Sequence, residues 1–305
     1  MGGHQRGRTV RVDELACLGR VDLAVEWIER IDGFDPVAVF GDVIVLGGEA
    51  EIRGFSLSER RVLWHCAAEA WRPGTGGPMI REESSWVEVD PRTGRSRRRL
   101  RLPGMPALFE GDLILCASES AIGEFASFDA REGRTLWARD LLMDAQIEGG
   151  GLEVCNGTTP GQFVATNHTA GQTMAFSLEN GELLWKVGVS VPYYRPLVAN
   201  GRIPILTLSL RGNDYVLLDE RTGGVLVNRH EEGLAGMIHQ QTGSMWGASR
   251  VVFTSESGHI AAFDLESGEL IALERTNSTL WGSTIVDNRL LVPSAMGELL
   301  VYEMT

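Results

Sequence analysis

Apolar and polar residues alternate in short runs along this chain, and one arrangement of them recurs. Residues 124–137, EFASFDAREGRTLW, contain it most completely. We take Asp129 as the anchor of this segment. Equivalent anchors are Ser56, Asp90, Ser177, Asp219, Asp264 and Glu303, which divide the chain into repeats 1 to 7 in chain order. Runs this short, recurring at intervals of about forty residues, predict β-strands in a repeated unit.

At fixed distances from the anchor, the same types of residue recur in most repeats. The residue before the anchor is apolar in all seven repeats, and the fourth residue after it is glycine in five of them, with Arg60 the exception in repeat 1. Glycine at that place indicates a tight turn that needs a positive φ angle between two strands. The eighth residue after the anchor is a tryptophan in three repeats: Trp64, Trp137 and Trp185. We expect these large rings to pack between neighbouring repeats.

Two more short apolar runs precede each anchor, so each repeat contains about four strands. Four short strands in every forty residues are typical of a β-propeller blade, and seven anchors predict an all-β, seven-bladed β-propeller of four-stranded antiparallel blades. Prolines introduce the inner strands, at Pro36, Pro78, Pro106 and Pro196, because a strand tolerates proline at its first residue. Repeat 2, near residues 75–102, lacks a clear second strand.

The two ends of the chain complement one another. Residues 21–31, which contain Trp27, resemble the outer strand of a blade, and the chain stops two residues after its last anchor. We therefore predict that this N-terminal strand pairs with residues 298–304 and completes the last blade, which leaves no exposed sheet edge. The predicted domains are an N-terminal extension, residues 1–20, and a single propeller, residues 21–305.

The motif D-x-x-x-G-x-x-L-W, as in DAREGRTLW and its variant SLENGELLW, resembles the repeat of the PQQ-like β-propellers. This family includes quinoprotein alcohol dehydrogenases and the propeller lipoprotein of the outer-membrane β-barrel assembly machine. The resemblance implies the architecture. It does not imply a bound quinone cofactor (PQQ), because the family's dehydrogenases are about twice as long, have eight blades and carry an adjacent cysteine pair that this chain lacks. We expect no cofactor, and PQQ in particular is not expected.

Composition narrows the class of partner and the compartment. A net charge of −13 disfavours a nucleic acid or an anionic membrane surface as partner, because both attract positive charge. Cys17, Cys66, Cys116 and Cys155 show no C-x-x-C spacing, and the first twenty residues contain no apolar segment of signal-peptide length. We therefore expect a cytoplasmic protein with free thiols.

One basic segment stands out from this acidic background. Six arginines fall between Arg92 and Arg101. Two interpretations are open: a docking site for an acidic partner, or an outer edge strand that its charges protect against aggregation.

The candidate site lies in the connections that lead from the outer strand of one blade to the inner strand of the next. These connections should surround one mouth of the central channel. They contain Asp35, Trp71, Arg72, Glu148, Tyr193, Tyr194, Arg195, His239, Gln241 and Trp281. Aromatic faces with a few cations, amides and an imidazole are typical of ligand recognition. The alternative is that channel mouths are polar in any propeller and that aromatic rings wedge between blades.

These observations are compatible with two functions, which belong to different classes of protein. The first is a non-catalytic binding module that presents its channel mouth to a partner protein or a small ligand. The alternative is a small-molecule enzyme of lyase, cyclase or hydrolase type in the central funnel. In that enzyme His239 acts as acid or base, Arg195 stabilises negative charge, and Tyr194 or Trp281 orients the substrate. No histidine stands at metal-ligand spacing with another histidine or a cysteine, so no metal site is expected.

Overall fold

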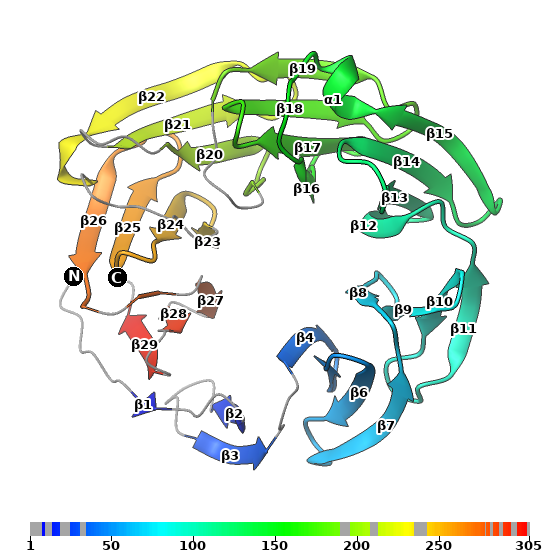
Figure 1. The fold of residues 1–305 in the computed structure, drawn as a ribbon. Helices are drawn as coiled ribbons and strands as arrows, with labels where there is room; N and C mark the ends of the chain where they lie inside the picture. The colour runs from blue at the N-terminus through cyan, green and yellow to red at the C-terminus, as the bar shows by residue number, and fades with distance from the viewer. Residues whose placement is uncertain are drawn as a thin grey trace. The chain divides into compact units, whose positions relative to one another are not determined.

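The computed structural model of the chain describes residues 8–9, 14–18, 25–30, 35–189, 196–207, 213–234, 243–277, 279–280, 283–286, 289–293 and 298–303. The described residues are almost entirely in strands and turns (Figure 1). Their helices are α1 (Leu141–Asp144) and the short 3-10 helix η1 (Glu232–Leu234). Neither has the length and apolar character that a membrane crossing requires, and no other helix occurs in these ranges.

The chain divides into two compact units. The N-terminal unit comprises Val10–Glu119 and Ala126–Leu136, and the C-terminal unit comprises Met1–Thr9, Ser120–Phe125 and Trp137–Thr305. Strands β14 (Glu124–Asp129) and β15 (Arg134–Asp140) contain the points of division.

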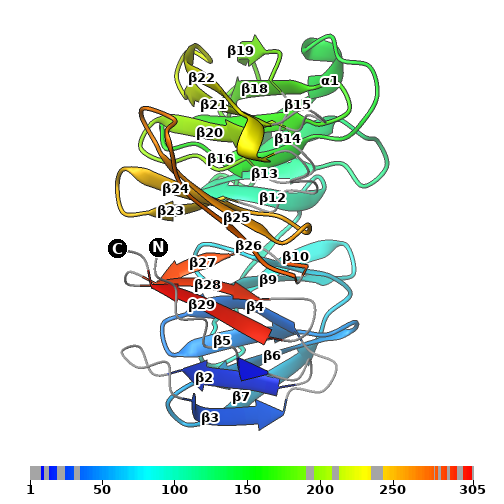
Figure 2. The ribbon, with the colours of Figure 1, turned by 90° about the vertical axis from the view of Figure 1, so that its left-hand side faces the viewer.

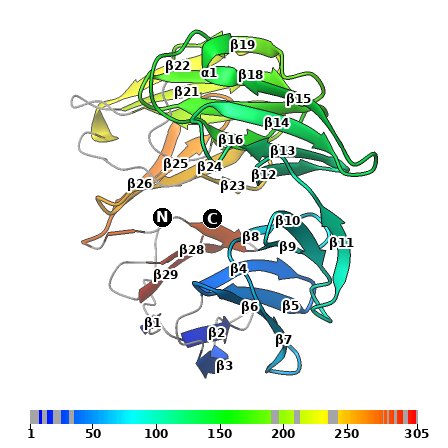
Figure 3. The ribbon, with the colours of Figure 1, turned by 45° about the vertical axis from the view of Figure 1, so that its right-hand side comes forward.

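Antiparallel sheets that follow the repeats make up the N-terminal unit (Figure 3). Repeat 1 is β4 (Asp35–Phe40), β5 (Val43–Gly47), β6 (Glu51–Ser56) and β7 (Arg61–Ala67). Repeat 2 is β8 (Trp71–Pro73), β9 (Pro78–Glu82), β10 (Ser85–Val89) and β11 (Ser96–Leu100). Repeat 3 begins with β12 (Met105–Glu110) and β13 (Leu113–Ala117), and its sheet continues into β14 and β15. A separate two-stranded sheet pairs β2 (Glu14–Leu18) with β3 (Val25–Arg30).

The C-terminal unit continues the same plan (Figure 2). Repeat 4 is β16 (Glu153–Asn156), β17 (Gln162–Asn167), β18 (Gln172–Ser177) and β19 (Leu183–Val187). Repeat 5 is the three-stranded sheet β20 (Arg202–Leu206), β21 (Asn213–Asp219) and β22 (Val225–Glu231). Repeat 6 is β23 (Ser244–Trp246), β24 (Arg250–Thr254), β25 (His259–Asp264) and β26 (Leu270–Arg275). Repeat 7 is β27 (Thr284–Val286), β28 (Arg289–Pro293), β29 (Glu298–Glu303) and the N-terminal β1 (Arg8–Thr9).

The anchor side chain explains the turn that follows it. The Asp90 carboxylate accepts the backbone N–H groups of Arg92 at 3.0 Å and Thr93 at 2.8 Å, and Asp129, Asp219 and Asp264 do the same in their repeats. Such a side chain closes the turn by supplying an acceptor to otherwise unpaired donors. The fourth residue after the anchor then has positive φ, as predicted, both at Gly94 with 69° and at the exception Arg60 with 54°.

The repeat tryptophans pack between repeats, as the sequence predicts. Trp64, Trp137 and Trp185 are 8%, 9% and 8% exposed. Their indole N–H groups donate to the carbonyl of the residue after the next anchor: to Pro91 at 2.7 Å, Leu178 at 2.9 Å and Glu220 at 2.8 Å. The turn glycine lies against the same ring, since a Cβ on Gly223 would come within 2.5 Å of Trp185. Glycine at this position is therefore favoured for two reasons: the turn needs a positive φ angle, and the tryptophan ring of the preceding repeat leaves no space for a Cβ.

The core lies in layers between successive sheets of each unit. In the N-terminal unit, one cluster joins Val45 and Ile52 of repeat 1 to Ile80 and Val87 of repeat 2 around Trp64. In the C-terminal unit, comparable clusters join repeats 4 and 5, 5 and 6, and 6 and 7. Since both faces of these strands are covered, their apolar runs are nearly continuous, as in β18.

Two expectations about strands were wrong. Repeat 2 does have a second strand: Pro78 begins β9, and the inner strand is the short β8, joined to it by a turn in which Gly74 N–H donates to Gly77 O at 3.1 Å. The strand that contains Trp27 does not pair with residues 298–304. It pairs with β2, with Trp27 opposite Cys17, while β1 places Arg8 opposite Leu299. Pairing with β2 closes a short loop, which costs less conformational entropy than a contact across the whole chain.

Candidate functional site

The N-terminal unit brings three of the predicted site residues to one end of its inner strands. Asp35 begins β4 and lies opposite Gly47 in the register. The ring of Trp71 covers Gly47, because a Cβ there would lie 2.6 Å from Trp71 Cε2. Arg72 donates from Nη1 to the Trp71 carbonyl at 2.9 Å and from Nη2 to Met105 Sδ at 2.6 Å.

These contacts favour a structural role for part of the predicted site. Trp71 is half-buried and packs with the core cluster of repeats 1 and 2. Arg72 is half-buried as well, and it ties the inner strand of repeat 2 to the start of β12 in repeat 3. Trp71 is thus a wedge between strands, which is the alternative that the sequence left open for aromatic residues near a channel mouth.

The C-terminal unit shows one of the predicted connections in full, the one that contains Glu148. The chain leaves β15 at Asp140, which is the N-cap of α1 and accepts from Leu142 N at 3.0 Å and Met143 N at 3.1 Å. Aspartate is favoured at an N-cap because it pairs N–H groups that have no partner within the helix. After α1, Ile147 N donates to Leu142 O at 2.9 Å, and Glu148 follows with an exposed side chain.

Beside this connection lie two strongly exposed apolar side chains that the sequence did not single out. Ile122 is 76% exposed and Met143 is 75% exposed. Their segments are in contact, because Leu141 N donates to Gly123 O at 2.9 Å and Leu142 covers Gly123. The sequence signal was an N-cap aspartate before Leu-Leu-Met, which indicates a helix start, but only the fold shows that Met143 points away from the core.

Near this apolar pair, the acidic residues outnumber the basic ones, which are Arg139 and Lys186. Glu124, next to Gly123, and Glu148, after α1, are exposed, and no ion pair joins either of them to a basic residue within the described ranges. Asp144 of α1 has a cation nearby, with Arg139 Nη1 at 3.4 Å. We call Ile122, Met143, Glu124 and Glu148 the α1 rim. It is an apolar centre with acidic neighbours.

The remaining predicted site residues lie outside the described residues. These are Tyr193, Tyr194, Arg195, His239, Gln241 and Trp281. Their roles stay predictions.

The arginine segment is an edge strand. Strand β11 stands at the end of its sheet order, and three of its arginines face acidic partners on its own sheet or turn. Arg97 Nη2 lies 2.6 Å from Asp90, Arg98 Nε 2.5 Å from Glu88 and Arg99 Nη2 2.5 Å from Glu82. Charges on an edge strand protect it against pairing with other chains, which agrees with the second interpretation. Arg95 and Arg101 are exposed, and the docking interpretation stays a hypothesis.

A serine and histidine cluster occupies the turn between β24 and β25. His259 Nδ1 lies 2.9 Å from Ser257 Oγ, which lies 2.9 Å from Ser255 Oγ. Burial, with Arg275 opposite, lowers the pKa of His259. His259 is 3% exposed, so the cluster belongs to the packing of this turn. In the part of the chain described, no group of three or more His, Cys, Asp or Glu side chains is placed to hold a metal ion.

Comparison with known proteins identifies the fold. Among solved structures, BamB from Moraxella catarrhalis has a TM-score of 0.67 at 15% identity, over 99% of this chain and 100% of that one. The C-terminal WD40 domain of Sif2 has a TM-score of 0.68 at 11% identity, over 99% and 92% of the two chains. The β-propeller domain of Cps50 (Swd1) from Myceliophteria thermophila has 0.61 at 9%, over 90% and 97%. At these identities the likeness shows the fold alone, which is a β-propeller.

The sequence comparison identifies the family. No curated protein matches it. A family model described as outer membrane protein assembly factor BamB matches residues 121–304, which is more than half of the 305-residue chain. The repeat motif and the structural likeness agree with this match, and the chain belongs to the BamB family of PQQ-like β-propeller repeat proteins.

Proposed function

We propose that this chain is a non-catalytic binding module whose partner is a protein. The observation that carries the proposal is the α1 rim, where Ile122 and Met143 expose about three quarters of their side chains. Large exposed apolar side chains that lie together are typical of interaction sites, whereas single ones are ordinary. The fold adds support, because BamB-like and WD40 propellers are commonly protein-interaction modules.

The acidic neighbours of the α1 rim define the partner's chemistry. With Glu124 and Glu148 beside the apolar pair, and a net charge of −13 on the chain, the complementary surface carries lysine or arginine around an apolar anchor. The apolar pair supplies affinity, and the carboxylates supply orientation and a dependence on salt.

The test is a capture experiment from the native host with three forms of the protein. The double variant Ile122→Ser, Met143→Ser should lose the partner that the parent retains, and that partner's retention by the parent should fall as salt rises. Leu226→Ser, at a 48% exposed position on β22, is the matched control and should retain the partner. Equal recovery by the parent and the double variant would rule the α1 rim out.

We further propose that the seven repeats form seven blades of a ring that β1 closes by pairing with β29. Seven anchors and the β1–β29 register support this proposal, and β2–β3 is then an additional two-stranded sheet. We propose a cytoplasmic location, with which the thiols of Cys66 and Cys116 agree, and we propose that the protein works without PQQ or another cofactor.

The channel-mouth residues and the enzyme alternative share one test. Tyr194→Ala, Arg195→Ala, His239→Ala and Trp281→Ala should each fold, and the module hypothesis predicts that binding of a small ligand at the mouth weakens in all four. If His239→Ala alone abolishes turnover of a substrate that still binds, the protein is an enzyme.

A further inference from the structure

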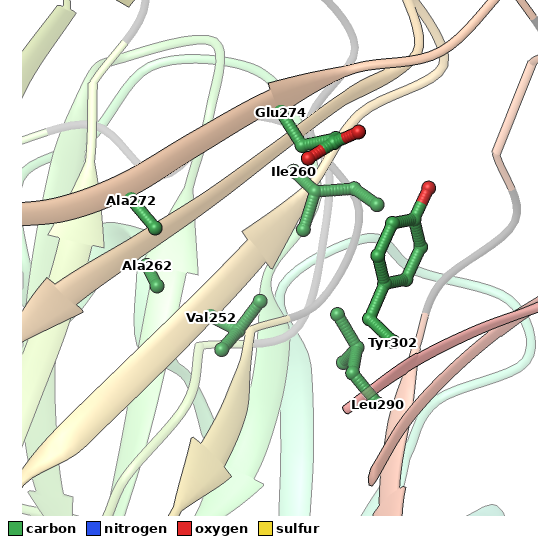
Figure 4. Close-up of a pocket in the computed structure, with 7 residues that line it drawn as sticks. All are labelled: Val252, Ile260, Ala262, Ala272, Glu274, Leu290 and Tyr302. Carbon is green, nitrogen blue, oxygen red and sulfur yellow. The ribbon is translucent and has the colours of Figure 1, made fainter. Parts of the chain in front are cut away.

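The cavity between repeats 6 and 7 is too small for a ligand (Figure 4). Val252, Ile260 and Leu290 form its apolar walls, and its volume is about 10 Å³. A cavity of about 10–15 Å³ holds one water molecule. This space therefore belongs to the packing of the C-terminal unit and offers no binding site.

The half-buried arginines of the N-terminal unit differ in their partners. The structure describes four of them. Three lie beside a glutamate: Arg53 at 3.0 Å from Glu51, Arg81 at 2.7 Å from Glu119 and Arg98 at 2.5 Å from Glu88. The fourth, Arg72, forms no ion pair with any residue that the structure describes.

The contacts that Arg72 does make leave its charge uncompensated. Its acceptors are the carbonyl of Trp71 at 2.9 Å and the sulfur of Met105 at 2.6 Å. Neither acceptor is charged, and a thioether is a weak one. Two of the five N–H groups of the guanidinium are used in this way, which leaves three without an acceptor among the described residues.

A cation in this state lowers the stability of the fold, because partial burial removes water and no carboxylate replaces it. The chain contains 41 acidic residues, so carboxylates are abundant in it, yet none of those described lies beside Arg72. A side chain that costs stability is typical of a site whose partner is a ligand.

The position of Arg72 suits recognition of an anion. It lies opposite Met79 in the register of β8 and β9, and its contact with Met105 spans from repeat 2 to the first residue of β12 in repeat 3. The two contacts hold the planar guanidinium in place. A held guanidinium binds a carboxylate or a phosphate through two parallel N–H groups.

We propose that Arg72 is an anion-binding residue of the N-terminal unit, and that its ligand is a small molecule with a carboxylate or phosphate group. The unused N–H groups of the guanidinium donate to two oxygens of this group. The site goes beyond the binding of a protein at the α1 rim and shares no residue with it, so either proposal can fail without the other.

The first measurement is the thermal midpoint Tm of the full chain in a Tris chloride buffer without oxyanions. Arg72→Met should raise Tm, because an apolar side chain of similar length replaces an unpaired cation. Arg98→Met is the matched control and should lower Tm, because it leaves Glu88, whose side chain is 10% exposed, without its partner. A fall in the Tm of Arg72→Met would overturn the proposal, since it would make Arg72 a structural tie between repeats 2 and 3.

The second measurement is Tm against the concentration of inorganic phosphate or of acetate, with sodium chloride keeping the ionic strength constant. A ligand that binds the folded state raises Tm in a saturable way. The parent should show this rise and Arg72→Met should not. Arg72→Lys should weaken the apparent affinity by about tenfold, because an ammonium group does not provide the planar fork.

Arg131→Met is the control for general surface charge, because Arg131 is exposed and belongs to the same unit. It should respond like the parent. Equal rises in the parent and in Arg72→Met would overturn the proposal, and so would a parent that responds to neither anion. A response at lower concentrations of phosphate than of acetate assigns the site to a phosphate group, and the reverse order assigns it to a carboxylate.

Discussion

Single residues in this protein serve the turn and the packing at the same time. Gly223 has φ 68°, and a Cβ on it would meet the ring of Trp185, while the indole N–H of Trp185 reaches Glu220 O at 2.8 Å. The surroundings of the Trp185 ring are therefore built by two repeats together, and losing the ring destabilises both.

Trp185→Ala should lower the free energy of unfolding by about 3–5 kcal/mol, the usual cost of removing a buried aromatic ring. Urea denaturation followed by circular dichroism measures it. Leu184→Ala is the control, since the neighbouring side chain is 48% exposed and its loss should cost less than about 1 kcal/mol. Equal costs for the two variants would mean that the ring does not hold the repeats together.

The anchor carboxylates make stability depend on pH. Hydrogen bonds from Arg97, and then from the turn around Thr93, lower the pKa of Asp90 to about 2. The ordinary value of an aspartate in the unfolded chain is about 3.9, so the contribution is complete above that pH and is lost as the pH falls toward 2.

Asp90→Asn should therefore be less stable than the parent at pH 6, by about 1–2 kcal/mol once the 24% exposure of the Asp90 side chain is allowed for. The difference should shrink as the pH falls from about 4 to 2. Denaturation of both proteins across this range checks it, and a difference that is constant with pH would contradict it. Arg97→Ala should bring the Asp90 pKa back toward its ordinary value, as NMR titration can show.

At the scale of elements, α1 shows how a single turn of helix can position an exposed surface. Leu141 is fully buried and anchors the helix, and Lys186 Nζ donates to Ala145 O at 2.7 Å at its far end. In Figures 1 and 3, α1 lies beside β18 of repeat 4. The helix thus holds Met143 outward above a buried Leu141.

Asp140→Ala removes the N-cap and should cost about 1 kcal/mol, within a range of about 0.5–2 kcal/mol for such losses. Hydrogen exchange of the Leu142 and Met143 amides, which donate to Asp140, should accelerate. Asp144→Ala, in the same helix but with only the 3.4 Å contact to Arg139, is the control and should stay within about 0.5 kcal/mol. Unchanged exchange in Asp140→Ala would show that the cap is dispensable.

For the whole molecule, the pairing of the two ends is the feature with the largest consequence. Among the described residues, strand β1 covers the edge of β29 through two residue pairs, Arg8 with Leu299 and Thr9 with Glu298. An uncovered strand edge is a template for pairing with other chains.

Removing residues 1–9 should therefore lower Tm and cause aggregation that depends on protein concentration, as light scattering during a thermal ramp would show. Removing only residues 1–5 keeps Arg8 and Thr9 and should leave both quantities unchanged. A truncation of residues 1–9 that stays monomeric and melts like the full chain would contradict the role of β1.

Much of the candidate site could not be predicted from the sequence. Glu148 was expected in a connection at the inner-strand ends, and it does follow α1 with its side chain exposed. Trp71 was expected there too, but its ring packs on Gly47, because a ring beside a residue without a Cβ buries more apolar surface than one in water. The sequence indicated the helix start before Met143 but not that Ile122 and Met143 are exposed, since an apolar residue in a pattern looks the same whether it is buried or exposed.

By itself, the sequence determined the repeat, its strands and its turn. The spacing from Asp90 to Gly94 encodes a turn closed by hydrogen bonds across two to four residues, and contacts that short depend on little beyond the local chain. Only the tertiary structure decided that β1, and not the strand with Trp27, pairs with β29, because many strands of similar apolar pattern compete for a distant partner.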